Sequence, residues 1–215
     1  MMMKRMIVAV VLGCLVLTGC ATRQVTTAEH GLYFSAMPRF SLEAQDPGLV
    51  FIGKTIQNQS GNTDRGTPCY ATEETYVYAK KGGNTAEKIV IVTVTTMDSN
   101  RVLFLPNMFS HLTIPHELIR ETIDGKSMQS CFCVANSPSP SEETLLMEKG
   151  MLLKPPYAVN ILGGLLGGTS NGMMTILYME AMPEGETLPK EAMIDHRNTA
   201  FTLKFKTAPI MDKDI

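Results

Sequence analysis

Two runs of strand-forming residues with a short turn between them constrain the fold of this chain most. Thr75–Ala79 and Lys88–Thr95 are rich in β-branched and aromatic residues, which favour strands. The segment between them, Lys80–Asn84, holds two adjacent glycines of the kind that tight hairpin turns use. A second turn at 98–100 leads into Arg101–Leu105, and so short a connection predicts a third, neighbouring antiparallel strand. The sequence therefore predicts an antiparallel meander.

Shorter segments on both sides of this hairpin extend the predicted sheet. Residues 32–46 are expected to form an irregular lead-in that ends in an Asp-Pro-Gly turn, and the polar stretch 57–68 predicts a loop. Apolar or β-branched runs predict strands at Leu49–Ile52, Ser130–Ala135, Val159–Leu162, Met173–Met179 and Asn198–Lys206.

Helix signals are confined to two segments. Ser139–Glu142 has the pattern of a capping box with proline at the first helical position, and Gly150 provides a stop, so residues 140–149 are predicted to be helical. Pro115–Ile123 is expected to be either a short helix or an irregular crossing. Strands with inserted helices in this order predict an α+β domain: an antiparallel sheet with one or two short helices.

The N-terminus has the order of parts that a bacterial secretion signal has. Lys4 and Arg5 come before Met6–Leu17, an almost wholly apolar run that is too short for the ~20 residues of a membrane-spanning helix. The run closes on Leu17-Thr18-Gly19-Cys20, which resembles the lipobox of bacterial lipoprotein precursors. That resemblance implies cleavage after residue 19, fatty acylation (palmitate and similar chains) of Cys20, and a mature chain that starts at Cys20. The other reading is an ordinary cleaved signal with a chance cysteine.

The resemblance also sets the expected organisation and location. Removal of the signal peptide, residues 1–19, leaves 196 residues (215 − 19), which we divide into a lipidated N-terminus and flexible tether over 20–31 and a single domain over 32–215. More than one acyl chain gives stable membrane attachment without a spanning helix. Ala21 stands where inner-membrane lipoproteins have Asp, so we expect the periplasmic face of the outer membrane if the cell has one.

Charge narrows the partners that the mature chain can have. Because Lys4 and Arg5 are the charged residues of the signal, the mature net charge is 17 − 21, or −4, without a long block of one sign. Nucleic acid is therefore an unexpected partner, and the expected partners are the membrane and another envelope protein or cell-wall component. No cofactor is predicted.

Three cysteines remain for the folded part. A structural disulfide from Cys69 to either Cys131 or Cys133 is expected in an oxidising compartment, and it would contribute roughly 4 kcal/mol in the chain-entropy model. A direct bridge between Cys131 and Cys133 is disfavoured, because alternate residues of a strand lie about 6.6 Å apart. The remaining thiol is expected to be buried.

Two motifs suggest other functions. Gly168–Gly172 matches the G-x-S-x-G serine elbow, and His196 follows in hydrolase order, which gives an alternative reading as a serine hydrolase that uses Ser170 and His196. Glycines at positions 164, 168 and 172 are similar to the glycine-zipper segments of some outer-membrane lipoproteins, which gives a second alternative, a membrane-inserted protein. We favour two strands that face each other across a glycine-rich loop, and we assign no catalytic residue.

A metal site is suggested by four potential ligands that lie close together in the sequence: Met108, His111, His116 and Glu117. Pro115 removes the helical spacing that such ligands would need, so no metal is predicted there. The sequence thus favours a lipid-anchored envelope lipoprotein with a non-enzymatic binding or structural role.

Overall fold

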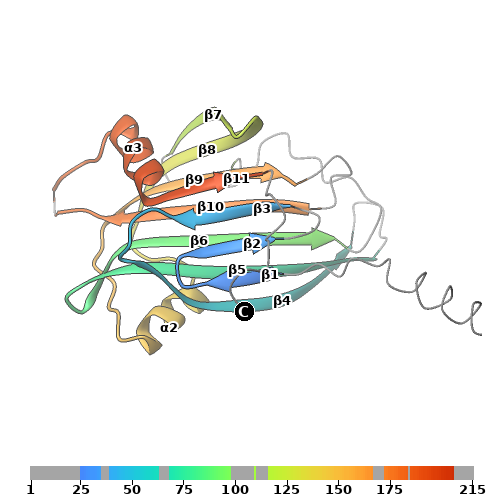
Figure 1. The fold of residues 1–215 in the computed structure, drawn as a ribbon, viewed down its shortest axis with the longest axis horizontal. Coiled ribbons are helices and arrows are strands. Elements are labelled where there is room, and N and C mark those ends of the chain that lie inside the picture. The colour runs from blue at the N-terminus through green and yellow to red at the C-terminus, as the bar shows by residue number, and fades with distance from the viewer. Residues whose placement is uncertain are drawn as a thin grey trace, which may run out of the picture.

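In the part of the chain that the structure describes, the fold consists of a large and a small antiparallel sheet with two short helices. The computed structural model describes residues 25–34, 39–62, 68–97, 109, 116–166, 172–183 and 185–205. Figure 1 shows the small sheet lying in front of the large one, with helix α3 at one end and α2 at the lower edge. The predicted α+β class, with its antiparallel sheet and short helices, is confirmed.

The large sheet has seven strands in the order β4-β5-β6-β10-β9-β8-β7. Every neighbouring pair is antiparallel. The strands are β4 (Leu49–Asn62), β5 (Pro68–Gly82), β6 (Thr85–Met97), β7 (Glu117–Ile123), β8 (Lys126–Ala135), β9 (Tyr157–Leu165) and β10 (Gly172–Ala181).

Local turn chemistry explains the two tightest hairpins of this sheet. The β5–β6 turn contains Gly83 at φ 65°, and the β7–β8 turn contains Asp124 at φ 46° followed by Gly125 at φ 77°. Left-handed backbone at these points is what glycine, and to a lesser degree aspartate, adopts at low cost. The predicted hairpin over 75–95 is therefore confirmed, and it extends further at both ends than its strand-forming core.

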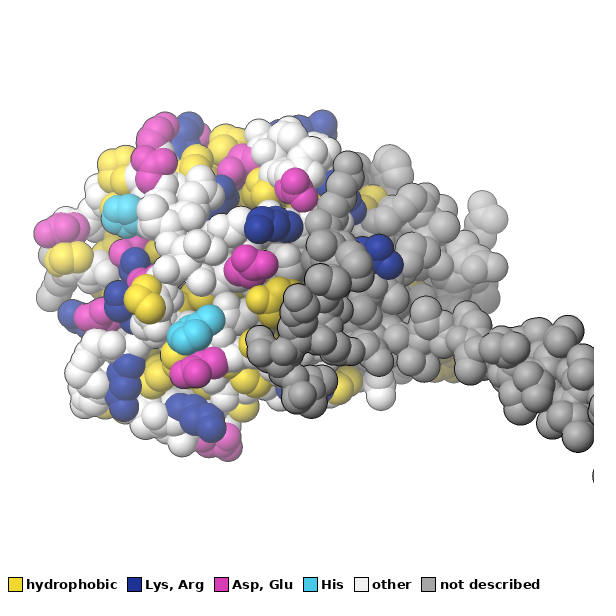
Figure 2. Space-filling model, viewed as in Figure 1, with side chains coloured by type: hydrophobic (Ala, Val, Ile, Leu, Met, Phe, Trp, Pro, Cys, Tyr) yellow, Lys and Arg dark blue, Asp and Glu magenta, His cyan; other side chains and the backbone are white. Residues whose placement is uncertain are grey.

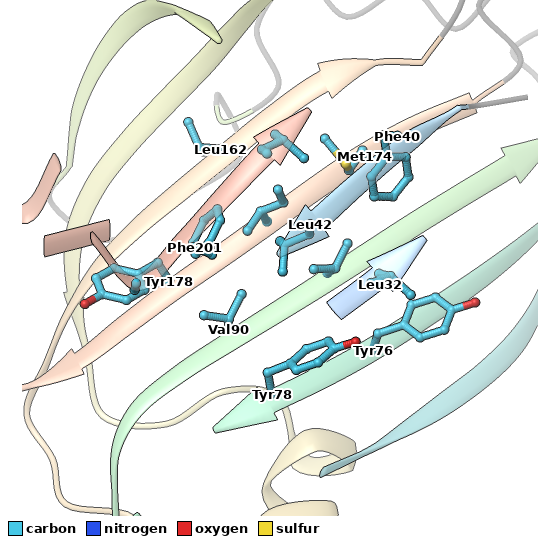
Figure 3. Close-up of a cluster of buried hydrophobic side chains, with 14 of the residues drawn as sticks. Leu32, Phe40, Leu42, Tyr76, Tyr78, Val90, Leu162, Met174, Tyr178 and Phe201 are labelled. Carbon is cyan, nitrogen blue, oxygen red and sulfur yellow. The ribbon is translucent and has the colours of Figure 1, made fainter. Parts of the chain in front are cut away.

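The small sheet has the order β1-β2-β3-β11 and covers one face of the large sheet. Its strands are β1 (Val25–Ala28), β2 (Gly31–Phe34), β3 (Phe40–Ala44) and β11 (Phe201–Lys204). The two sheets enclose the main core, in which Phe34 stacks on Phe40 with ring centroids 4.4 Å apart and meets Tyr76 edge-on at 5.7 Å. Figure 3 shows Leu32, Leu42 and Phe201 facing Val90, Leu162 and Met174 across this layer.

The opposite face of the large sheet holds a second core under α2 (Pro140–Glu148). Leu146 is fully buried there, and Gly53 of β4 lets Leu145 approach, since a Cβ on that glycine would lie 3.1 Å from the Leu145 side chain. The helix begins with Pro140 as predicted, but Ser139 makes no side-chain capping hydrogen bond. α3 (Lys190–Ala200) packs at the other side of the sheet, against β9 and β11.

Several sequence expectations about the elements were wrong. Residues 57–62 belong to strand β4 and residue 68 begins β5, while 63–67 lie outside the described residues. The lead-in contains β2 and β3, Pro115–Ile123 contains strand β7, and the start of Asn198–Lys206 belongs to α3. The strand predicted at Arg101–Leu105 lies outside the described residues. In the described part of the sheet, β6 pairs with β5 on one edge and with β10 on the other.

The predicted tether over 20–31 needs a similar correction. Val25–Ala28 pairs with β2, and the turn after it is fixed by a hydrogen bond between His30 Nδ1 and the Leu49 carbonyl at 3.1 Å. Residues 25–31 therefore belong to the folded domain and not to a flexible tether. Residues 1–24, including the signal and Cys20, lie outside the described residues.

Candidate functional site

A polar row crosses all seven strands of the large sheet on the face that carries α2. The register aligns one residue from each strand, and we call this set the threonine row: Thr55, Thr75, Thr93, Thr175, Gly163, Gln129 and Arg120. Thr75 is buried, and its hydroxyl lies 3.3 Å from that of Thr93. The neighbouring row toward α2 is apolar, so the threonine row marks the edge of the apolar core on this face.

The threonine row ends in a hollow beside Arg120. The hollow has a volume of about 240 Å³ and is lined by Arg120, Ser127, Met128, Gln129, Gly163, Gly164 and Leu165. Gly163 lies between Gln129 and Thr175 in the row, so a side chain is missing where the hollow forms. With an exposed guanidinium, a hydroxyl and an amide around it, the hollow is suited to a small anionic or hydroxylated group.

A buried polar cluster beneath α3 has a different character, because its members satisfy one another. Arg197 is 2% exposed and donates to both carboxylate oxygens of Glu121, at 3.1 and 2.8 Å, and to Asn160 Oδ1 at 2.8 Å. Asn160 in turn donates to Ser130 Oγ at 2.7 Å. Although burial by itself raises the pKa of Glu121, hydrogen bonds from Arg197 and Ser130 hold it below its ordinary value. The cluster fastens α3 to β7 and β9 and leaves no group for a substrate.

His196 belongs to a third set of charged groups, at the end of β10. Its Nδ1 lies 2.9 Å from Glu180 Oε2, which also accepts a hydrogen bond from the Tyr178 hydroxyl at 2.9 Å. Lys88 lies 3.9 Å from the other Glu180 oxygen and 3.7 Å from Asp46. The lowered pKa of Asp46 follows from its hydrogen bonds with Gly48 and Lys80, which outweigh its burial. Ion pairs in this set link the turn before β4 with β5, β6 and β10, and the contact of His196 with Glu180 joins α3 to it.

The structure describes one member of the hydrolase pair. Ser170 lies outside the described residues. His196 Nδ1 lies 2.9 Å from Glu180 Oε2, at the end of β10.

Cys131 and Cys133 are both free thiols. Cys131 is fully buried beside Phe109, and burial raises its pKa to about 12; burial raises the pKa of Cys133 as well. The side chain of Cys69 lies outside the described residues, but its backbone belongs to β5.

The strand register places Cys69 far from both of its predicted disulfide partners. The residue of β5 in line with Cys131 is Val77, and three strands, β9, β10 and β6, lie between β8 and β5. Cys69 is eight residues from Val77, about 27 Å along the strand, whereas disulfide Cα atoms lie less than 7 Å apart. Neither candidate partner is placed to bond Cys69 in this structure, and the expectation of one buried thiol holds for Cys131.

Of the four residues that suggested a metal site, Met108 and His111 lie outside the described residues. His116 immediately precedes β7, and Glu117, the first residue of that strand, forms an ion pair with Lys190. Among the residues that the structure describes, no group of three potential ligands could hold a metal ion. Gly163 and Gly164 lie in β9 and Gly172 begins β10, so the favoured arrangement of two facing strands is confirmed and the glycine-zipper helix is wrong.

Sequence reasoning missed the threonine row and the Arg197 cluster, since both depend on strand register.

No family model matches this chain, and neither a curated protein nor a solved structure matches it. In the part of the chain that the structure describes, no helix is long and apolar enough to cross a membrane.

Proposed function

We propose that this protein is a lipid-anchored lipoprotein of the bacterial cell envelope whose domain has a non-enzymatic binding or structural role. The observation that carries the proposal is the basic, apolar and small-residue order that ends at Leu17-Thr18-Gly19-Cys20. The position of the domain is consistent with it, because β1 starts at Val25, after the proposed cleavage point. Processing at Cys20 would leave the folded part intact.

The binding role is supported by the character of the described surface. The hollow beside Arg120 is polar and open, whereas the Glu121 and Glu180 carboxylates are engaged in ion pairs within the domain, with Arg197 and Lys88 respectively. A site that captures a group from another envelope component needs only such complementary donors. Hydrolysis would need a nucleophile beside a base, whereas the described part of the chain places His196 beside the Glu180 carboxylate.

Acylation is tested by expressing the full chain in a bacterial host with its own signal. Intact-mass spectrometry of the purified protein should give a chain that begins at Cys20 and carries fatty acyl groups. Cys20→Ser should abolish labelling by a fatty-acid analogue, whereas Cys14→Ser, the same change within the signal, should leave labelling intact. A wild-type protein with residues 1–19 retained, or with an unmodified Cys20, would overturn the proposal.

The outer-membrane address is tested separately. Ala21→Asp introduces the residue that holds the resembled class at the inner membrane, so in a Gram-negative host the variant should move to the inner-membrane fraction of a density gradient. Ala21→Ser is the matched control and should remain with the outer membrane. Identical fractionation of the Asp variant and wild type would refute this address while leaving acylation itself standing.

A further inference from the structure

The hollow beside Arg120 carries a positive charge that the described part of the chain leaves unpaired. Arg120 is exposed on the edge strand β7, at the top of Figure 1, and no carboxylate among the described residues pairs with its guanidinium. The face that carries the small sheet is different. Figure 2 shows acidic and basic side chains interspersed over that face, where Lys204 lies 3.8 Å from Glu43. The hollow therefore keeps one cation available for a ligand.

Strand alternation explains why Arg120 lacks an acidic partner within its own strand. The carboxylates of β7 are Glu117 and Glu121, and each lies an odd number of residues from Arg120, so both point to the opposite face of the sheet. On that face Glu117 pairs with Lys190, and Glu121 pairs with Arg197. The acidic side chains nearest in sequence are thus already neutralised elsewhere.

The other walls of the hollow offer a hydroxyl and apolar contact without a second charge. Gln129 of β8 lies directly opposite Arg120, and Ser127 lies diagonally across from it, within reach of a side chain as long as arginine. Ser127 is exposed, and its hydroxyl can donate one hydrogen bond. Leu165 also lines the hollow and is 36% exposed, so it provides an aliphatic surface.

The size and charge of the hollow limit the ligand that it can take. Its volume of about 240 Å³ falls below the ~300–1,000 Å³ of pockets that enclose drug-sized molecules, so it suits an end group or a short side chain. One guanidinium neutralises one negative charge, whereas a phosphate dianion would leave excess negative charge on a chain that is already acidic. The guanidinium fork matches a planar carboxylate through two parallel hydrogen bonds. A carboxylate that carries a small aliphatic group fits these observations together.

We propose that the hollow beside Arg120 binds the C-terminal carboxylate of a peptide from another envelope component. Arg120 donates two hydrogen bonds to the carboxylate, Ser127 donates a third, and the terminal aliphatic side chain lies against Leu165. A peptide end is favoured over an aspartate or glutamate side chain, because its carboxylate and its side chain start from the same carbon and can reach both walls. The inference rests on the binding role proposed above, and it does not depend on the lipid anchor.

The probe for this site is N-acetyl-alanyl-alanine, and its C-terminal amide is the matched ligand control. Ligand-observed NMR titration measures binding to the full-length protein purified from its bacterial host, with its acyl groups determined by mass spectrometry. At the affinity per non-hydrogen atom of drug-sized ligands, a probe of about fourteen such atoms should bind with a Kd of about 1 mM. The amide should bind at least about tenfold more weakly, since it offers the guanidinium no charge.

Substitutions in the hollow should weaken binding without disturbing the fold. Arg120→Gln should raise the Kd at least about tenfold, and Ser127→Ala should raise it about threefold or more. Lys54→Gln is the matched control, because Lys54 is an exposed cation on β4, the opposite edge strand of the same sheet, and its loss should leave the Kd unchanged. Circular dichroism of each variant should match wild type, since all three changed side chains are exposed.

Equal binding of the acid and the amide, or a wild-type Kd in Arg120→Gln, would refute the carboxylate site. Displacement of the probe by inorganic phosphate at concentrations well below its own Kd would assign the hollow to phosphate instead. If the acylated protein does not bind the probe, the site is wrong while the lipid anchor stands; if a chain without acyl groups binds it, the anchor is wrong while the site stands. Cleavage of the probe, visible in the same spectra, would overturn both the site and the non-enzymatic role.

Discussion

Removing the Arg197 guanidinium should destabilise the domain through the carboxylate that it leaves behind. In Arg197→Met the stem is kept, but Glu121 loses two hydrogen bonds and its counter-charge, and Asn160 loses a donor. Breaking one partner of a buried ion pair costs about 3–5 kcal/mol. Because 14% of the Glu121 side chain is exposed and some hydration can return, we expect the lower end, about 3 kcal/mol.

Urea unfolding followed by circular dichroism measures this loss. With a slope of about 2 kcal/mol per molar urea, the midpoint should fall by about 1.5 M. The double variant Glu121→Gln with Arg197→Met removes the stranded charge as well, so it should be more stable than Arg197→Met alone by about 1 kcal/mol or more. A single variant within about 1 kcal/mol of wild type, or a double variant that is no better than the single one, would refute the reasoning.

The same cluster predicts the direction of a pH dependence. The pKa of Glu121 is lowered in the folded protein, so its stabilising contribution is complete above the unfolded pKa of about 4.3 and is lost as the pH falls through the lower folded value. The Arg197→Met variant lacks that contribution. The gap between its unfolding midpoint and that of wild type should therefore be widest at neutral pH and should narrow in acid. A gap that stays constant from pH 7 to pH 3 contradicts this account.

Three further predictions concern packing, surface charge and thiols. Leu146→Ala should cost about 2–4 kcal/mol in unfolding free energy, because the side chain is fully buried under α2, while Met147→Ala, 57% exposed, should cost under about 0.5 kcal/mol by the same urea assay. Asp46→Asn should lower the melting temperature at pH 7, and this loss should shrink as the pH falls below the unfolded pKa of about 3.9 toward the lowered folded pKa of Asp46; an equal loss at pH 7 and in acid would oppose this. Native protein at pH 7.5 should resist alkylation at Cys131, whose pKa of about 12 leaves it protonated, and Cys133 should also react slowly; peptide mapping that finds rapid labelling of both before urea is added would contradict the burial.

The sequence predicted best the elements whose signals are local. The hairpin over 75–95 combines β-branched strands with a glycine turn, and the helix over 140–148 begins with a proline at its first position. Each of these signals acts within a few residues of chain, so it survives without knowledge of the tertiary fold.

The elements that were missed depend on distant partners. β4 extends through 57–62, where glutamine, asparagine and serine have weak strand propensity, because it pairs with β5 along its full length. The buried face of α3 includes Arg197, whose partner Glu121 on β7 lies 76 residues earlier in the chain. Because a charged residue occupies that face, the sequence of α3 lacks the apolar stripe that identifies an ordinary surface helix. β7 is an edge strand with Leu118 40% exposed, which obscures its alternation.

The candidate site was the least predictable part for the same reason. The threonine row takes one residue from each of seven strands, and no pair within it is close in sequence. A shift of one residue in any strand would send its member to the opposite face. Pairing therefore had to be known before Arg120, Gln129 and Gly163 could be grouped.

The pairing of β11 with β3 has a consequence for the biogenesis of the domain. Phe201, Leu203 and Phe205 belong to the main core, and β11 completes the small sheet at a position that no earlier segment fills. A nascent chain can form the central hairpin early, but the layer over Tyr178 stays open until residue 205 has left the ribosome. Premature termination before residue 201 would thus yield an incomplete core.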